Sequence, residues 1–209
     1  MRVVIGDDLA ELGADWIAQR AEGQAQFAIS LAGGSTPRVV YERLATMPLA
    51  WETWHVWWGD ERMVQPDHAD SNERMAREAL LDKVGIPESQ ITPLRGLDTP
   101  LPTQFDVVLL GIGTDGHTAS LFPGDAGLDA TAPIVQVDRP DHPRLSLTYP
   151  VINAAKCAVF LASGEGKREI VKRVIERDLA LPASHVQAGE TVVLADRTAL
   201  EGESEASSS

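Results

Sequence analysis

The stretch FDVVLLGIGTDGHTASLFPG, which runs from Phe105 to Gly124, decides how this chain folds. Its first part, Phe105–Leu110, is an apolar run with the length of a buried strand. A glycine-rich turn follows at once and presents Asp115 and His117. A flexible backbone that carries a carboxylate and an imidazole at the carboxyl end of a strand is a typical layout for chemistry in an α/β protein. The stretch therefore predicts both a fold class and the place of a site.

The rest of the chain alternates short apolar runs with helical patterns. Seven further runs have the length and composition of strands: Arg2–Ile5, Phe27–Leu31, Trp54–Trp58, Ile134–Val137, Leu145–Thr148, Ala158–Ala162 and Val192–Ala195. Helices are predicted over Leu9–Ala21 from its apolar spacing, over Pro37–Leu44 behind an N1 proline, from a capping box of Asp70 and Glu73 to Val84, and after Gly166.

Strands spaced by helices in this way imply βαβ units. We therefore expect an α/β fold in a single Rossmann-like domain over residues 1–199, with a mainly parallel sheet and helices on both faces. The acidic end, residues 200–209, is predicted to be a disordered tail, because nothing from Glu201 onward is apolar and larger than alanine.

The formal net charge of the 209 residues is −13. This balance disfavours binding to nucleic acid or to an anionic membrane, because phosphate groups attract basic surfaces. A small phosphorylated ligand stays possible, since two cations and a few backbone N–H groups can hold one phosphate. No apolar run approaches the ~20 residues that span a bilayer, and no signal-peptide core is visible. We expect a cytoplasmic monomer whose lone cysteine, Cys157, packs in the core.

Two other strand ends carry residues suited to binding. The segment LAGGSTP places Gly33, Gly34, Ser35 and Thr36 before a helix, where N–H groups and hydroxyls can hold an anion. The alternative there is a glycine turn with ordinary Ser/Thr capping.

The second segment is GDER, which begins at Gly59. Successive side chains point in different directions, so at most two of Asp60, Glu61 and Arg62 are expected to face one cleft. The alternative is a solvated loop with a surface ion pair. Farther along the chain, Arg144 at a strand start and Lys167 at a helix start are each ordinary surface cations alone, but together they can supply the charges that a phosphate needs.

The run from Gly111 to Gly116 also spells G-x-G-x-x-G. A dinucleotide loop needs its third glycine to open a full helix, and here Pro123 ends any helix within about two turns. The catalytic alternative makes His117 a general base, which suits an imidazole titrating near ~6.5, with Asp115 orienting it. Asp115 and His117 have no third ligand at a diagnostic spacing, so no metal is predicted.

The remaining histidines have no comparable context, and we predict them to be loop or surface residues: His55, His68, His142 and His185.

The five segments together resemble the 6-phosphogluconolactonase family, in order and in spacing. The resemblance runs through GGSTP, GDER with Ser71 and Asn72 after it, GxGxDGHTASLFPG, RxSLT and GxxK, so it covers nearly all of the chain except the tail. Glucosamine-6-phosphate deaminases share the first and third elements, but their pattern has a tyrosine at the position of Arg62 and a glutamate before Pro123. These departures favour the lactonase.

The resemblance implies hydrolysis of 6-phospho-D-glucono-1,5-lactone to 6-phosphogluconate, the second step of the pentose phosphate pathway, without metal or cofactor. His117 would deprotonate water. Ser35, Thr36, Arg144 and Lys167 would hold the phosphate, with Gly33, Gly34 and Gly116 giving room for the substrate. Arg62 would stabilise the oxyanion or bind phosphate, and Asp60 and Asp115 would bind sugar hydroxyls or tune His117. The alternatives are the deaminase and a sugar-phosphate-sensing module without catalysis, for which no DNA-binding segment is recognised.

Overall fold

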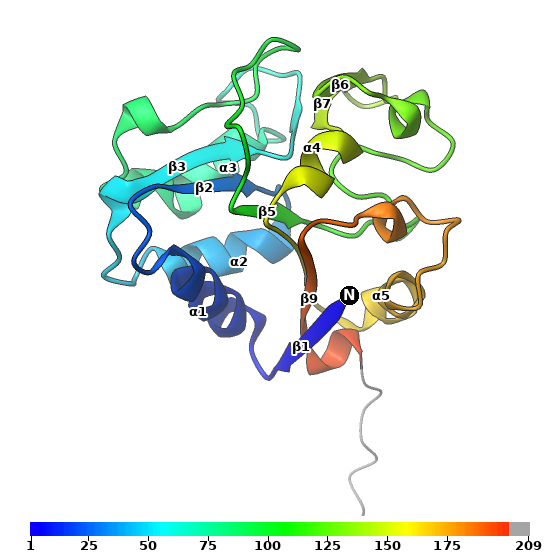
Figure 1. The fold of residues 1–209 in the computed structure, drawn as a ribbon, viewed down its shortest axis with the longest axis horizontal. Helices are drawn as coiled ribbons and strands as arrows, with labels where there is room; N and C mark the ends of the chain where they lie inside the picture. Colours follow the sequence, from blue (N-terminus) through cyan, green and yellow to red (C-terminus); the bar gives the residue numbers. More distant parts are fainter. Residues whose placement is uncertain (201–209) are drawn as a thin grey trace, which may run out of the picture.

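One parallel sheet forms the centre of the molecule (Figure 1). A computed structural model describes residues 1–200, and the expected tail lies almost wholly in residues 201–209, outside them. Six strands pair in the order β1-β9-β8-β5-β2-β3, and every pairing is parallel. Their bounds, in chain order, are Arg2–Gly6 (β1), Phe27–Leu31 (β2), Trp54–Trp58 (β3), Val107–Leu110 (β5), Cys157–Ala162 (β8) and Glu190–Asp196 (β9).

The central strands are apolar along their whole length because both faces of the sheet are covered. All residues of β5 and β8 are buried, as expected for parallel strands with layers on both sides. Cys157 begins β8 and is buried in the core, as predicted. The α/β fold with a mainly parallel sheet is confirmed.

A second, smaller sheet stands apart from the first. It is antiparallel, with the order β4-β7-β6, and its strands are Asp60–Arg62 (β4), Ile134–Val137 (β6) and Arg144–Leu147 (β7). Its register places Arg62 opposite Arg144. The segment after Trp58 is therefore a short strand and not the solvated loop of the alternative prediction.

Helices flank the main sheet on both sides. Their bounds are Leu9–Ala21 (α1), Ser35–Leu44 (α2), Asn72–Ala79 (α3), Tyr149–Ala154 (α4) and Arg168–Ile175 (α5). In Figure 1, α1 and α2 lie on one side of β9, and α4 and α5 lie on the other. Short 3-10 turns complete the connections: Trp51–Thr53, Leu81–Lys83, Glu88–Gln90, Ala126–Asp129, Glu165–Lys167, Pro182–His185 and Arg197–Ala199. No helix within residues 1–200 is long and apolar enough to cross a membrane.

Two predicted helix starts are wrong. Helix α2 begins at Ser35, with Gly34 as its N-cap, so Pro37 is its third residue. Helix α3 is capped by Ser71, whose hydroxyl accepts from the Arg74 amide, and not by Asp70. It also ends at Ala79 and gives way to a 3-10 turn before Val84.

Candidate active site

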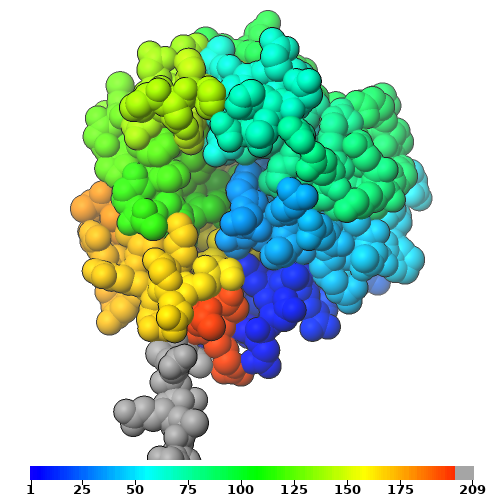
Figure 2. Space-filling model, turned by 180° about the vertical axis from the view of Figure 1, so that it is seen from behind, coloured from blue at the N-terminus to red at the C-terminus, as the bar shows by residue number. Residues whose placement is uncertain are grey.

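A cavity of about 280 Å³ opens at the carboxyl ends of β2, β3, β5 and β8. From β2 the chain continues to β3 on one side of the sheet, and from β5 it continues to β8 on the other, so the strand order changes direction between β2 and β5. Open α/β sheets bind ligands at such switch points. Figure 2 shows a hollow where the blue segment of α2, the green loop after β5 and the yellow segment around Lys167 meet. Most of the predicted site residues line it: Gly33, Gly34, Ser35, Thr36, Asp60, Arg62, His117, Arg144 and Lys167. Asp115 and Gly116 belong to the same loop as His117 but are not among the lining residues.

His117 is held at this wall through one ring nitrogen. Its Nδ1 lies 2.6 Å from Oδ1 of Asp115, and the same oxygen accepts from the His117 amide at 3.1 Å. No hydrogen bond joins Nε2 to any residue from 1 to 200, so this nitrogen is free for a ligand. Partial burial raises the pKa of Asp115, but the hydrogen bonds from His117 outweigh it and hold that pKa below its ordinary value. Asp115 is therefore a carboxylate that accepts from an Nδ1–H tautomer.

Gly113 makes room for the imidazole. A β carbon on residue 113 would overlap the Nδ1 atom of His117, so no other residue type fits without moving the ring. The ring also packs against Phe122, with centroids 4.3 Å apart. Phe122 in turn carries the guanidinium groups of Arg139 and Arg144 at 3.9 and 5.5 Å from its centroid. The imidazole is thus fixed by packing as well as by hydrogen bonding.

The strand β4 divides its side chains between two faces, as its alternation requires. Asp60 and Arg62 line the cavity, and Glu61 points away from it. This agrees with the expectation that at most two of the three face one cleft. The carboxylate of Asp60 is buried and accepts from the Ser120 hydroxyl at 2.6 Å.

Glu61 holds the start of α3. Its carboxylate accepts from the amides of Asn72 and Glu73 at 2.8 and 2.7 Å, and from the Ser71 hydroxyl at 3.1 Å. Burial raises the pKa of Glu61 above its ordinary value, although the amide donors work against this. A negative charge at a helix N-terminus is favourable, so the strand that carries Arg62 and the helix that begins at Asn72 are locked together.

Asn72 is a cavity residue whose role the sequence did not reveal. Its Nδ2 donates to the Asp60 carbonyl at 2.8 Å, and its Oδ1 accepts from Nη1 of Arg62 at 3.1 Å. A β carbon on Gly33 would overlap the Asn72 side-chain amide, so a glycine is needed there. Asn72 therefore joins β4 to the loop before α2. Asn72 belongs to a segment that matches the family pattern, but its partners lie on another element, β4, ten and twelve residues earlier in the chain.

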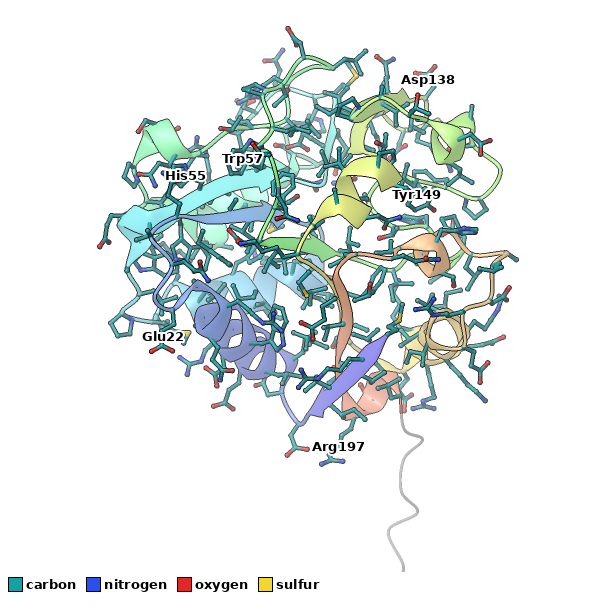
Figure 3. All side chains as sticks on the ribbon, viewed as in Figure 1. Glu22, His55, Trp57, Asp138, Tyr149 and Arg197 are labelled. Carbon is teal, nitrogen blue, oxygen red and sulfur yellow. The ribbon has the colours of Figure 1, made fainter. Side chains whose placement is uncertain are left out.

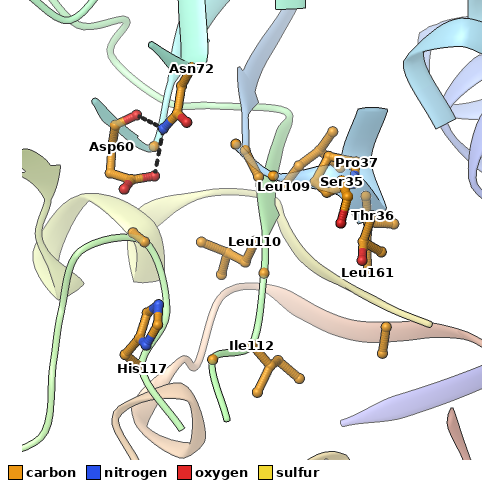
Figure 4. Close-up of a pocket in the computed structure, with 18 of the residues that line it drawn as sticks. Ser35, Thr36, Pro37, Asp60, Asn72, Leu109, Leu110, Ile112, His117 and Leu161 are labelled. Atoms are coloured by element: carbon orange, nitrogen blue, oxygen red, sulfur yellow. Dashed lines mark hydrogen bonds between the residues drawn. The ribbon is translucent and has the colours of Figure 1, made fainter. Parts of the chain in front are cut away.

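Helix α2 directs its N-terminus at the cavity. Ser35 and Thr36 form its first turn, and no side chain caps it. The free N–H groups of a first turn and the helix dipole favour an anion. Figure 4 shows Ser35 and Thr36 on one side of the β5 end and His117 on the other, with Leu110 between them.

Three cations complete the cavity: Arg62, Arg144 and Lys167. The two arginines are cross-strand neighbours on β4 and β7. Arg144 pairs with Asp141 at 2.6 Å, and Nη1 of Arg62 donates to Asn72 and to the Asp70 carbonyl. The Nε atoms of both arginines are buried without a hydrogen-bond partner. Lys167 donates from Nζ to the Ile112 carbonyl at 2.7 Å. Against these charges, Asp60 is the sole carboxylate among the described lining residues, so the cavity suits an anionic ligand.

Known proteins are similar to this chain in both sequence and architecture. The chain matches the family model "Glucosamine-6-phosphate isomerases/6-phosphogluconolactonase" over residues 4–194. A 6-phosphogluconolactonase of Nostoc sp. is 42% identical over 202 residues, 84% of each chain. A crystal structure of the 6-phosphogluconolactonase from Thermotoga maritima aligns with a TM-score of 0.83 at 28% identity, covering 93% of this chain and 99% of that one.

The deaminase branch has the same fold. A monomeric glucosamine-6-phosphate deaminase aligns with a TM-score of 0.80 over 95% of this chain and 98% of its own, at 22% identity. The fold alone therefore does not separate the two activities, and the family description names both. With the family model spanning nearly all of the described residues, the resemblance predicted from the motifs is confirmed: this chain belongs to the family of glucosamine-6-phosphate isomerases and 6-phosphogluconolactonases.

Proposed function

We propose that this protein hydrolyses 6-phospho-D-glucono-1,5-lactone to 6-phospho-D-gluconate, in the pentose phosphate pathway. The curated relative from Nostoc sp. carries the name of this activity and matches 84% of the chain. The observation that carries the proposal is the His117–Asp115 pair, set in a wall that also holds Arg62, Arg144 and Lys167. A base beside several cations fits a lactone that bears a phosphate.

His117 acts as the general base. Asp115 fixes the proton on Nδ1, so Nε2 takes a proton from water as the water oxygen bonds to the lactone carbonyl carbon. The carbonyl electron pair moves to its oxygen and forms a tetrahedral oxyanion. When that oxyanion collapses, the bond to the ring oxygen breaks, and the proton on Nε2 passes to the departing oxygen. An activated ester of this kind needs water, a base and an oxyanion donor.

The two ends of the cavity bind different parts of the substrate in this proposal. We place the phosphate at the N-terminus of α2 with Ser35 and Thr36, and assign its neutralisation to Lys167 and to Arg144, which lies opposite Arg62 on β7. The carbonyl lies across the β5 end, beside His117. Asp60 and Asn72 are on the His117 side in Figure 4, and Asn72 holds Arg62. On this basis we assign Arg62 to the developing oxyanion.

Two substrates test this division. The Lys167→Ala and Arg144→Ala variants should raise KM for the phosphorylated lactone by at least about tenfold and leave turnover of unphosphorylated glucono-1,5-lactone nearly unchanged, because each removes a charged hydrogen bond worth ~1.5–3 kcal/mol. Arg62→Ala should lower kcat for both lactones by ~100-fold, as loss of an oxyanion donor does. Lys172→Ala, on the exposed face of α5, is the control. Rates are corrected for spontaneous hydrolysis. An equal loss on both substrates for Lys167→Ala would overturn the phosphate assignment.

The deaminase alternative would need a glutamate that this chain does not have at the matching position. Where the deaminase pattern has a glutamate before the proline, this chain has Phe122, whose ring packs on His117. No carboxylate is available at that position for ring-opening chemistry. Ammonia release from glucosamine 6-phosphate would overturn the lactonase assignment.

We further propose that a monomer is active, because this one chain supplies the base, the anion site at α2 and three cations to the same cavity. Size-exclusion chromatography at assay concentrations, with activity measured across the peak, tests this. Activity confined to a dimer fraction would contradict it.

A further inference from the structure

Three polar side chains outside the cavity converge at the far ends of β4 and β7. His68 and Asp70 belong to the segment between β4 and α3, and His142 precedes β7. Nε2 of His142 lies 3.1 Å from Oδ2 of Asp70, and Nδ1 of His68 lies 3.8 Å from the same atom. One ligand atom from each residue fits within 4.8 Å of the others. Figure 2 shows the cyan segment before α3 beside the yellow-green segment before β7.

We propose that His68, Asp70 and His142 form a binding site for a divalent transition-metal ion such as Zn²⁺. Two imidazoles and one carboxylate are a ligand set that zinc uses with bonds of about 2.0–2.2 Å, which places tetrahedral ligand atoms ~3.4 Å apart. The two observed distances, 3.1 and 3.8 Å, bracket that spacing. The side chains of His68, Asp70 and His142 are 43%, 57% and 29% exposed, so small rotations can close the third distance and water can complete the shell.

The backbone on both sides of the site is already ordered. The Met63 amide donates to the Pro143 carbonyl at 2.8 Å, which joins the two segments at their roots. The His68 amide donates to Gln65, and the Ser71 amide donates to His68. The Asp70 amide donates to Nδ1 of His68 at 3.1 Å, so this nitrogen is unprotonated, and the ion would replace the amide on its lone pair. Because these hydrogen bonds already order the backbone of both segments, the ion would cost little further chain entropy when it replaces the Asp70 amide as the partner of His68.

The ion would tie together the two strands that carry the cavity arginines. The Asp70 carbonyl accepts from Nη1 of Arg62 at 2.7 Å, so the residue that supplies the carboxylate ligand also holds Arg62. Arg144 lies two residues after His142 on the partner strand. The site therefore stabilises the small sheet from outside the cavity, and it takes no part in the hydrolysis proposed above.

Binding is measured on the full chain after chelator treatment, by calorimetric titration with Zn²⁺ and by the visible absorption of added Co²⁺. We expect one equivalent bound and a higher Tm with metal. His142→Ala and His68→Ala should each weaken binding by at least about 100-fold, because loss even of a group that only orients a metal ligand costs 10–100-fold. Tm and circular dichroism of the metal-free variants check that they fold.

Other histidines provide the controls. His55 lies on β3, is not part of the site, and stacks on Trp57 (Figure 3). His55→Ala should keep the parent's affinity, and so should His117→Ala, which removes the imidazole of the cavity. Retention of parent affinity in the His68→Ala/His142→Ala double variant would overturn the proposal. Loss of binding in His117→Ala would do the same, by moving the ion to the cavity. Neither result depends on whether the lactone is the substrate.

Discussion

Gly113 and His117 are in direct contact: the imidazole lies where a β carbon on residue 113 would stand. The same imidazole is bounded by Asp115 at Nδ1 and by Phe122 on its face. Three neighbours therefore fix one ring, and each of them comes from the loop that follows β5. The position of Nε2 is set by local packing.

A methyl group at position 113 should displace the ring without unfolding the protein. We expect Gly113→Ala to lower kcat by about 100-fold, the size of a lost general base, while the Tm changes by a few degrees. Steady-state kinetics and thermal unfolding measure the two effects. Gly111→Ala is the control in the same loop, because its β carbon meets nothing within 4 Å. Equal kcat values for the two variants would contradict a steric role for Gly113.

Removal of the Asp115 charge should slow turnover. The carboxylate fixes the Nδ1–H tautomer and stabilises the imidazolium that forms in the reaction, and an asparagine does neither fully. Because Asp115 is half exposed, we expect a loss in kcat of about 10- to 100-fold for Asp115→Asn, with little change in KM. Asp138→Asn, an exposed carboxylate on the far side of the small sheet, is the control (Figure 3). A normal kcat would remove Asp115 from the mechanism.

Glu61 should give stability a pH dependence of unusual sign for a carboxyl group. Its folded-state pKa is raised by burial, so folding favours its protonated form. Its contribution is then fully present below the ordinary pKa near ~4.3 and declines as pH rises through the folded value. Glutamine mimics the protonated form and does not titrate, so the variant keeps its stability as pH rises while the parent loses some. The free energy of unfolding that Glu61→Gln costs should therefore be larger at pH 4 than at pH 8.

Urea unfolding at both pH values measures this difference. Glu22→Gln, an exposed position after α1, corrects for general charge effects (Figure 3). A cost that grows with pH would mean that the amide donors of α3 outweigh burial and that the pKa of Glu61 is lowered.

Substitution of Ser71 and of Asp70 tests which of the two residues caps α3. Ser71→Ala removes the hydroxyl that accepts from the Arg74 amide, and we expect it to lower the free energy of unfolding by about 1 kcal/mol. Asp70→Ala, measured with chelator present, should cost less than ~0.5 kcal/mol, because its exposed carboxylate does not cap the helix. Chemical denaturation of both variants tests the order. A larger loss for Asp70→Ala would restore the capping box predicted from the sequence.

Local patterns predicted the elements well because their causes are local. The apolar spacing of Leu9–Ala21 gives the bounds of α1 as observed, and Asp8 caps it with bonds to the amides of Ala10 and Glu11. The error at Asp70 also has a local cause: two neighbouring residues could each serve as a cap. Glu61, which lies on another element, favours the later start by accepting from the Asn72 and Glu73 amides.

Contacts between different elements could not be predicted in the same way. Asn72 bonds to Arg62 and Asp60, and His142 meets Asp70 only because β4 and β7 pair. No periodicity in the sequence encodes that pairing. The cavity cations were found through their motifs, but their face-to-face arrangement needed the register of the small sheet.

The pairing of β4 with β7 also makes the cavity a reporter of folding. Its two arginines come from strands far apart in the chain, and their register forms only when the segments between them are in place. Contacts of such long sequence separation carry a high loop-closure cost and slow the folding of small domains. During refolding, ligand affinity should therefore return with the last long-range pairings and after the helices, so activity measures completion of the whole domain.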